Sequence, residues 1–180
     1  MNVTPTPRRQ RGLTLAEACC VLAITAILLT IGVPTLRDVL DARRLEGIAN
    51  QLASDIQFAR TEAVARNEPL RLSLHPAPGG SCYVIHTGPA DHCSCNADGP
   101  ARCLAGAQSM RTVVLATVDR VALQANVASM LFDPLQGTAS PASTLRVIGT
   151  RDRAIYQVVN ILGRVRSCSP RAAVPGYRAC

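Results

Sequence analysis

The longest hydrophobic segment of the chain lies near its N-terminus, over residues 13–36. Within these 24 residues, the side chains with strong hydrogen-bonding groups are Glu17 and the threonines Thr14, Thr25, Thr30 and Thr35. As a helix the segment is about 36 Å long, because each residue adds about 1.5 Å, and the hydrocarbon core of a bilayer is about 30 Å thick. The pattern therefore predicts a membrane-spanning helix over residues 13–36.

After residue 36 the hydrophobic pattern becomes sparser, but its helical period continues. Apolar residues recur at three- and four-residue spacing from Leu45 to Ala63, and charged residues occupy positions between them. Pro34 lies at the exit of the apolar segment, where we expect it to kink or loosen the helix. The Asn67-Glu68-Pro69 sequence ends the period. We therefore expect one helix over residues 13–66, with an amphipathic continuation over residues 37–66.

Beyond residue 66 the chain changes to short alternating segments separated by turn residues. Residues 70–74 alternate strictly between apolar and polar, residues 82–86 are strand-like, and the prolines and glycines between them indicate a turn. Further strands are predicted at residues 112–118, 127–132, 144–148, 154–160 and 163–168, and residues 87–106 are expected to form a loop. Many short strands behind one helix predict an α+β fold, in which the amphipathic helix packs on antiparallel sheets of a β-rich domain over residues 67–180.

The charges around the apolar segment predict its orientation. Arg8, Arg9 and Arg11 precede Gly12, and Glu17 is the only charge between Gly12 and Arg37. Arginines that flank a span stay on the cytoplasmic side, so the β-rich domain should lie across the membrane. An ionisable group inside a membrane helix is costly, so Glu17 should have a partner of opposite charge.

A short basic leader, Gly12, the Leu13-Thr14-Leu15-Ala16-Glu17 sequence and an apolar helix together resemble the N-terminus of type IV prepilins and pseudopilins. The resemblance implies a pilin-like fold, a leader peptide over residues 1–12, cleavage after Gly12 by a prepilin peptidase, and methylation of the new first residue, Leu13. It also implies that Glu17 binds the free amine of a neighbouring pilin subunit during assembly. The implied location is the inner membrane, with a single span and a periplasmic C-terminal domain, and then the extracellular pilus.

Other interpretations of this N-terminus fit less well. A secretory signal needs a small-residue cleavage site after the apolar segment, and Ile31-Gly32-Val33-Pro34 offers no good one. A lipoprotein signal would place the apolar segment before Cys19, whereas here it follows that cysteine. An ordinary membrane anchor stays open as an alternative.

Positive charge is concentrated at the other end of the chain. All 19 basic residues are arginine, the net charge is +7, and removing the three leader arginines leaves +4. From residue 146 onward there are seven arginines and one acid, Asp152; the arginines are Arg146, Arg151, Arg153, Arg164, Arg166, Arg171 and Arg178. Arg164 and Arg166 are two residues apart on a predicted strand, so both should point to one face while Val165 faces the core. We expect Gly163 to allow a tight turn from the preceding strand.

The Gly163-Arg164-Val165-Arg166 sequence and the amphipathic helix resemble the minor pilins of the FimT branch, in the family that also contains the type II secretion pseudopilin GspH. The resemblance implies binding of double-stranded DNA during natural transformation, with Gly163, Arg164 and Arg166 at the phosphate contacts. The residues themselves agree, because several guanidinium groups bind a polyanion without reading its bases. The predicted interface also includes Arg151, Arg153, Arg171 and Arg178. The alternatives are a solvated strand face, and a structural minor pilin or secretion pseudopilin that primes or caps a filament.

Six of the eight cysteines lie beyond the membrane segment, namely Cys82, Cys93, Cys95, Cys103, Cys168 and Cys180. An even number of cysteines in an oxidising compartment indicates disulfides. We expect a Cys168–Cys180 bridge, which would hold a C-terminal loop with Arg171 and Arg178 beside the other arginines. The other four cysteines allow three pairings, of which we favour Cys82–Cys93 with Cys95–Cys103. A zinc site that uses them with His86 or His92 is the alternative.

The sequence shows no catalytic signature. No Gly-x-Ser-x-Gly, P-loop or dinucleotide-binding sequence occurs, and the three histidines lie near turns or strand ends. We expect His86 and His92 at the surface. With three tyrosines, two phenylalanines and no tryptophan, a base-stacking platform is not expected. The prediction is a non-enzymatic protein that uses no cofactor and no metal.

Overall fold

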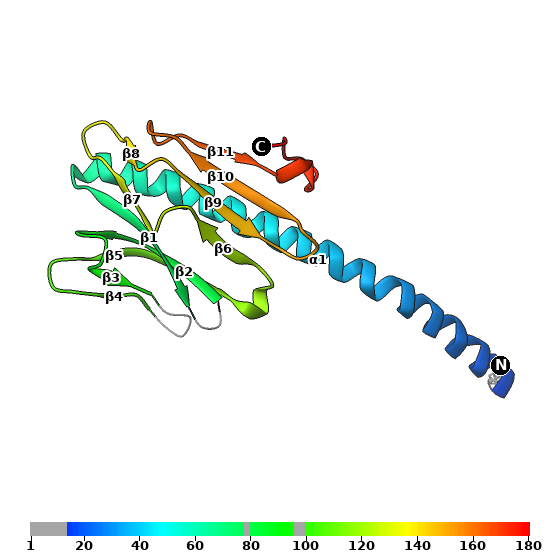
Figure 1. Cartoon of the computed structure of the whole chain (residues 1–180). Helices are drawn as coiled ribbons and strands as arrows, with labels where there is room; N and C mark the ends of the chain where they lie inside the picture. The colour runs from blue at the N-terminus through cyan, green and yellow to red at the C-terminus, as the bar shows by residue number, and fades with distance from the viewer. Residues whose placement is uncertain (1–13, 78–79, 96–99) are drawn as a thin grey trace, which may run out of the picture. The chain divides into compact units, whose positions relative to one another are not determined.

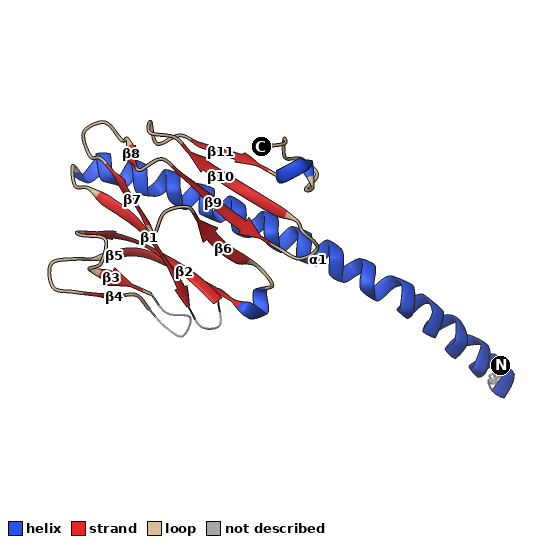
Figure 2. Ribbon diagram, viewed as in Figure 1, coloured by secondary structure: helices blue, strands red, loops and turns tan. Residues whose placement is uncertain are grey.

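The computed structural model describes residues 14–77, 80–95 and 100–180. These residues belong to two compact units, one ending at Val39 and one extending from Leu40 to Cys180. One long helix, α1 (Leu15–Arg66), contributes to both units, and the strands of the described residues all belong to the second (Figures 1 and 2). The long helix and the antiparallel sheets confirm the predicted α+β fold.

The first half of α1 has the composition of a membrane span. Every side chain from Thr14 to Arg37 is exposed, and the mean hydropathy of its most apolar window is 2.3. The threonine hydroxyls in this half are satisfied within the helix, since Thr25 Oγ1 donates to the Val21 carbonyl oxygen (2.7 Å) and Thr35 Oγ1 to that of Ile31 (3.1 Å). α1 continues through Pro34. The predicted cleavage site at Gly12 and Leu13 lies outside the described residues.

The second half of α1 is amphipathic and supplies one side of the hydrophobic core. Its buried apolar residues recur every three or four positions, at Leu45, Ala49, Leu52, Ile56, Ala59 and Ala63. They pack against the inner faces of the sheets, where Leu72, Phe132, Leu145 and Ile155 are fully buried. Burying a leucine- or isoleucine-sized side chain stabilises a fold by about 1.5–3 kcal/mol, so this stripe fixes the helix on the sheets.

Two antiparallel sheets and one short ribbon follow the helix. The first sheet has the order β5–β2–β1–β7–β8, with β1 (Leu70–Ala77), β2 (Gly80–Thr87), β5 (Ser109–Ala116), β7 (Ser129–Phe132) and β8 (Ala139–Ser140). The second has the order β11–β10–β9–β6, with β6 (Ala122–Ala125), β9 (Ser143–Ile148), β10 (Ala154–Val159) and β11 (Val165–Cys168). The ribbon pairs β3 (Cys93–Ser94) with β4 (Arg102–Cys103). The 3₁₀ turns η1 (Thr117–Asp119) and η2 (Pro170–Ala172) complete the second unit.

The predicted strands correspond to β1, β2, β5, β7, β9, β10 and β11, and three details differ. The strand predicted at 163–168 starts at Val165, so Gly163 and Arg164 lie in the turn before it. β6 and β8 were not predicted, because they are short and alternate weakly. The expected loop at 87–106 contains β3 and β4, which are two residues each and are joined by the disulfide between Cys93 and Cys103.

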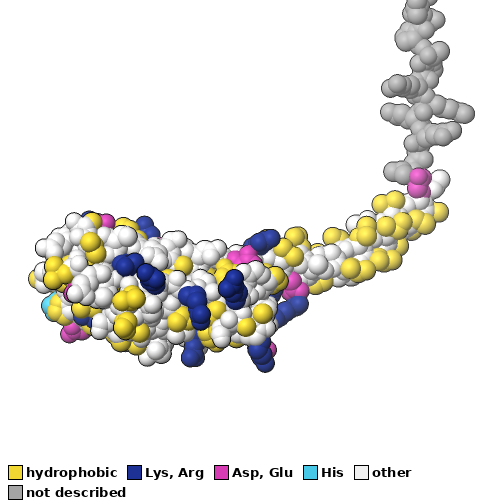
Figure 3. All heavy atoms as spheres, turned by 90° about the horizontal axis from the view of Figure 1, so that it is seen from above, with side chains coloured by type: hydrophobic (Ala, Val, Ile, Leu, Met, Phe, Trp, Pro, Cys, Tyr) yellow, Lys and Arg dark blue, Asp and Glu magenta, His cyan; other side chains and the backbone are white. Residues whose placement is uncertain are grey.

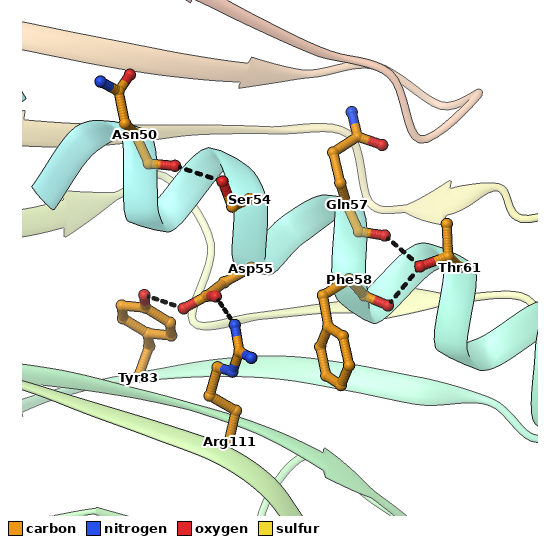
Figure 4. A network of polar contacts seen from close by, with 8 residues as sticks. All are labelled: Asn50, Ser54, Asp55, Gln57, Phe58, Thr61, Tyr83 and Arg111. Carbon is orange, nitrogen blue, oxygen red and sulfur yellow. Dashed lines mark hydrogen bonds and ion pairs between the residues drawn. The ribbon is translucent and has the colours of Figure 1, made fainter. Parts of the chain in front are cut away.

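A buried polar cluster connects α1 to the first sheet (Figure 4). Asp55 is fully buried on α1, and its carboxylate accepts the Tyr83 hydroxyl (2.6 Å) and pairs with the Arg111 guanidinium. Arg111 also lies over the Phe58 ring, 4.7 Å from its centroid. Burial raises the pKa of Tyr83 well above its usual value, and the hydrogen bond to Asp55 adds to the rise. The cluster therefore supplies the opposite charge that a buried carboxylate needs.

The disulfides correct one prediction. Cys168 is joined to Cys180, as expected, but the favoured pairing of the other four cysteines is wrong, because the bridges are Cys82–Cys95 and Cys93–Cys103. Pairing of β3 with β4 sets Cys93 directly opposite Cys103, and Cys95 then reaches Cys82 on β2. All four cysteines of the alternative zinc site are used in these bridges.

The surface position predicted for His86 is also wrong, because its side chain is fully buried in β2. Its Nδ1 lies 2.9 Å from the Thr87 carbonyl oxygen, which can only accept, so Nδ1 carries the proton. Nε2 then accepts the Ser73 hydroxyl, 2.8 Å away. Burial lowers the pKa of His86. Ser73 Oγ lies 2.8 Å from His86 Nε2 and 3.4 Å from the Ala90 carbonyl oxygen, so the loop after β2 lies over the face of the sheet that carries His86.

Candidate nucleic-acid interface

The four-stranded sheet has one face on α1 and one open face. Leu145, Ile155 and Gln157 are fully buried on the α1 face, and Gln157 Nε2 donates to the Ala49 carbonyl oxygen of the helix (2.9 Å). Side chains alternate along a strand, so Arg146 and Tyr156 occupy the open face.

Two arginines from different strands share this open face. Arg146 of β9 pairs in register with Tyr156 of β10, and its guanidinium lies over the Tyr156 ring, 5.5 Å from the centroid. Arg166 of β11 pairs with Val158 of β10, which is two residues from Tyr156 and therefore on the same face. β10 alone separates β9 from β11, and the partners of Arg146 and Arg166 on β10 are two residues apart, so their Cα atoms are about 12 Å apart across the sheet.

The turn between β10 and β11 holds Arg164 in a rigid setting. Asn160 fixes this turn twice, since its side-chain oxygen accepts the Arg164 N–H (2.9 Å) and its N–H donates to the Arg164 carbonyl oxygen (3.1 Å). Gly163 has a φ of +70°, and a Cβ there would lie 2.5 Å from the Gly137 carbonyl oxygen. Gly163 is therefore required both by its backbone conformation and by the space available. Arg164 itself is exposed.

The C-terminal loop (residues 169–180) is folded against the sheet and carries Arg171 and Arg178. The Cys168–Cys180 disulfide closes it, and the Ser169 N–H donates to the Arg178 carbonyl oxygen (2.9 Å). The Ser169 hydroxyl donates to the Ala154 carbonyl oxygen of β10 (2.8 Å), and Val174 is buried in the core. Arg171 and Arg178 are exposed, so the disulfide and these contacts present them at the surface.

The remaining two predicted arginines lie in the turn between β9 and β10. Arg151 is exposed, whereas Arg153 is half-buried and its Nε donates to the Thr150 carbonyl oxygen (3.4 Å). The Thr150 hydroxyl donates to Asp41 of α1 (3.3 Å). Because Asp152 stands between the two arginines in the same turn, they add less net charge than the others.

Contacts with α1 show how far the arginines extend along the second unit. The Arg151 turn contacts Asp41, Tyr177 beside Arg178 donates to Asn50 (3.2 Å), and Gly163 lies against Arg60. Nineteen residues of helix separate positions 41 and 60, which is about 28 Å. Figure 3 views the side of the molecule where β10 and β11 lie in Figure 1, and shows arginine side chains spaced along it with uncharged ones between them. The arginines form an extended row.

Five of these arginines form no ion pair within the part of the chain that the structure describes. Among the described residues, no carboxylate forms an ion pair with Arg146, Arg164, Arg166, Arg171 or Arg178. The ion pairs in this part of the chain use other arginines, such as Arg111 with Asp55 and Arg120 with Asp41 (3.2 Å). We call these five residues the arginine row. Exposed guanidinium groups that form no ion pair with the described acids suit an anionic ligand.

Sequence reasoning omitted Arg146 from the interface because it lies 18 residues before Arg164. The signal was present, since β9 alternates and Arg146 follows buried Leu145. β9 pairs with the edge of β10 that is opposite to β11, and this pairing brings Arg146 to the open face.

Two groupings that could suggest chemistry do not form a reactive site. Ser73 and His86 are hydrogen-bonded, but both side chains are fully buried, so a substrate has no access to them. Within the described ranges, no group of three or more His, Cys, Asp or Glu side chains has the arrangement of a metal site.

Comparison with known proteins shows which family and which folds the chain resembles. The family model for type II transport protein GspH matches residues 49–163. An 86-residue stretch is 32% identical to type II secretion system protein H of Xanthomonas campestris pv. campestris, covering 44% of this chain and 51% of that protein. The chain thus spans about half the length of this curated relative.

Two solved structures share the fold. The type IV minor pilin FimU of Pseudomonas aeruginosa superposes with a TM-score of 0.53 at 18% identity, covering 75% of this chain and 95% of FimU. The minor pseudopilin EpsH from the type 2 secretion system of Vibrio cholerae superposes with a TM-score of 0.50 at 10% identity, covering 71% of this chain and 98% of EpsH. These superpositions confirm the pilin-like fold that the N-terminal resemblance implies.

Proposed function

Because the chain belongs to the GspH family of type II transport proteins, we propose that it is a minor type IV pilin that binds duplex DNA without sequence preference and supports DNA uptake in natural transformation. The observation that carries the proposal is the arginine row. Its five members are exposed, and no carboxylate among the described residues pairs with them.

The dimensions of the surface suit a polyanion. Duplex DNA carries one phosphate charge per about 1.7 Å of its axis, so the roughly 28 Å between positions 41 and 60 of α1 faces many phosphates. Arginine forks bind phosphate oxygens, and contacts to the backbone carry no base information. Arg164 and Arg166 are the central contacts, Arg146, Arg171 and Arg178 extend the surface, and Arg151 and Arg153 lie at its edge.

The N-terminal features define how the protein reaches DNA. A prepilin peptidase removes residues 1–12 and the new N-terminal Leu13 is methylated; residues 13–36 span the inner membrane and the domain from residue 67 lies in the periplasm until assembly moves it to the pilus. Glu17 is exposed on α1 and holds the free amine of the neighbouring subunit. Mass analysis of the membrane form should find N-methylated Leu13 first. An intact Met1 leader on assembled protein would exclude this maturation.

A second function has one specific observation in its favour, the similarity to a type II secretion system protein H. In this alternative the chain is a pseudopilin that primes or caps a secretion filament and has no DNA ligand. It gives no physical reason for five exposed arginines without acidic partners on one sheet and its adjoining loops. The two functions therefore predict different consequences of removing those charges.

The experiment measures transformation and filament formation in the same cells. Arg164→Gln with Arg166→Gln removes two charges from the arginine row and leaves Val165 in the core. A control, Arg66→Gln with Arg102→Gln, removes the same number of charges from α1 and β4; the surface ion pair between Arg66 and Glu62 that it breaks contributes little to stability. The proposal predicts normal pili and poor DNA uptake for the first variant and normal uptake for the control. Normal transformation by the first variant would favour the pseudopilin. A loss of protein secretion without a loss of DNA uptake would favour it too.

A further inference from the structure

The turn between β10 and β11 exposes two large aliphatic side chains next to Arg164. Ile161 and Leu162 are 66% and 51% exposed, although both are flanked by well-ordered hydrogen bonds. Ile161 and Leu162 are adjacent in the same turn, so together they form an apolar contact surface beside Arg164 that a ligand can cover.

The turn cannot relax to bury them. Asn160 and Arg164, at the two ends of the turn, are joined to each other by two hydrogen bonds. The Ile161 carbonyl oxygen also accepts the Ala139 N–H of β8 (3.0 Å). Gly163 lies against the Gly137 carbonyl oxygen and the Arg60 side chain, which closes the inner side. Ile161 and Leu162 are thus presented outward by a rigid hairpin tip at low entropic cost on binding.

The charges beside the tip indicate which ligand it fits. Arg164 is part of the same turn, and Arg166 follows on the open face of the sheet two residues later. The carboxylate of Asp133, in the neighbouring turn, is not ion-paired with Arg164; one of its oxygens accepts the Leu135 and Gln136 N–H groups of its own turn (2.9 Å each). An aliphatic tip flanked by arginines matches a groove of DNA, where phosphates line the rims and the sugars of the walls offer apolar surface.

We propose that the β10–β11 turn is the groove-inserting element of the DNA site, with Ile161 and Leu162 packing on sugars and base edges of the minor groove while Arg164 and Arg166 contact the phosphates at its rim. This inference rests on the proposed DNA-binding function. Two strands about 4.8 Å apart form a tip wider than the roughly 6 Å minor groove once side chains are included. Insertion therefore widens the groove and bends the duplex.

The test uses the full chain in nanodiscs of zwitterionic lipid and a 30-base-pair duplex labelled at both ends. The variant is Ile161→Ser with Leu162→Ser, and the control is Leu104→Ser, because Leu104 is 60% exposed and lies beyond β4, away from the turn. Affinity is measured at several salt concentrations and bending by energy transfer between the labels. Both substitutions remove exposed apolar surface, so neither is expected to unfold the domain.

The parent protein should bend the duplex, and the Ile161→Ser, Leu162→Ser variant should bind about tenfold more weakly at every salt concentration and leave it straight. Its salt dependence should equal that of the parent, because no phosphate contact is lost. The Leu104→Ser control should behave as the parent. Netropsin, a minor-groove ligand, should weaken the parent more than the variant.

Equal affinity and equal bending by parent and variant would overturn the inference while leaving phosphate binding intact. Intact DNA binding with poor incorporation of the variant into filaments would also overturn it, since the tip would then contact a neighbouring subunit. If the parent itself does not bind DNA, the proposed function fails first, and the two failures are distinguished by this measurement.

Discussion

Removing the Arg111 side chain should destabilise the domain more than neutralising its partner Asp55. Arg111 is 44% exposed, whereas the Asp55 side chain is 1% exposed. In Arg111→Met the carboxylate stays buried with one remaining donor, the Tyr83 hydroxyl at 2.6 Å. An uncompensated buried charge costs about 3–5 kcal/mol, and losing the stack on Phe58 adds about 0.5–1 kcal/mol.

Neutralising Asp55 should reduce the free energy of unfolding less than removing the Arg111 side chain does. In Asp55→Asn the amide oxygen still accepts the Tyr83 hydroxyl, and the half-exposed Arg111 can be hydrated. The expected cost is about 1.5–3 kcal/mol, the range for losing a hydrogen bond to a charged group. Once Asp55 is neutral, Arg111→Met should cost little beyond the lost stack on Phe58, so the double variant should be less destabilised than the sum of the single variants by about 3–5 kcal/mol.

Urea unfolding of the full chain in detergent, followed by circular dichroism of the sheets, measures all four free energies of unfolding. Arg102→Met is the control, because Arg102 is exposed on β4 and forms no ion pair with the acids of the described residues. Additive costs, or Asp55→Asn costing more than Arg111→Met, would refute the reasoning that the buried carboxylate is the member needing compensation.

Three further outcomes follow from other parts of the fold. Gly163→Ala should lower the free energy of urea unfolding by at least about 2 kcal/mol, because its Cβ would meet the Gly137 carbonyl oxygen at 2.5 Å. Gly176 has a φ of +86° but open space around it, so Gly176→Ala should cost only about 1 kcal/mol. Equal costs would contradict the close approach at Gly163. Because the pKa of Tyr83 is raised in the folded state, its contribution to stability is complete below the unfolded pKa of about 10 and is lost as pH rises above it. Tyr83→Phe should therefore flatten the alkaline decline in stability. An unchanged decline would argue against the buried hydroxyl. The lowered pKa of His86 has the opposite sign: its contribution is complete above about pH 6.5 and is lost as pH falls below that, so His86→Gln should reduce the acid sensitivity of the unfolding midpoint, and an unaltered pH profile would contradict it.

The sequence predicted the long helix and most strands because their periods are strong and local. Leu45, Leu52 and Ile56 lie at helical spacing, and β9 and β10 alternate along their length. It could not place Arg146 beside Arg166, because strand order is a tertiary property and only the position of β9 next to β10 brings them to one face.

The cysteine pairing and the position of His86 were inaccessible for related reasons. Cys93 and Cys103 are paired by the β3–β4 ribbon, whose two-residue strands have no detectable period. His86 ends an apolar run, and its burial depends on the loop after β2, whose Ala90 carbonyl oxygen lies 3.4 Å from the Ser73 hydroxyl oxygen beside His86. Gly163 could be predicted to form a turn, whereas its contact with Gly137 depends on packing between two turns that are distant in sequence.

The salt dependence of DNA binding tests the central proposal most directly. The full chain in zwitterionic nanodiscs is titrated against unrelated 30-base-pair duplexes at several salt concentrations, for the parent and for Arg164→Gln with Arg166→Gln. The parent should bind all duplexes alike, and the variant should reduce the slope of log affinity against log salt by up to about 2, because each phosphate contact contributes about 0.9. The same slope and affinity for both proteins would show that these arginines are only solvated.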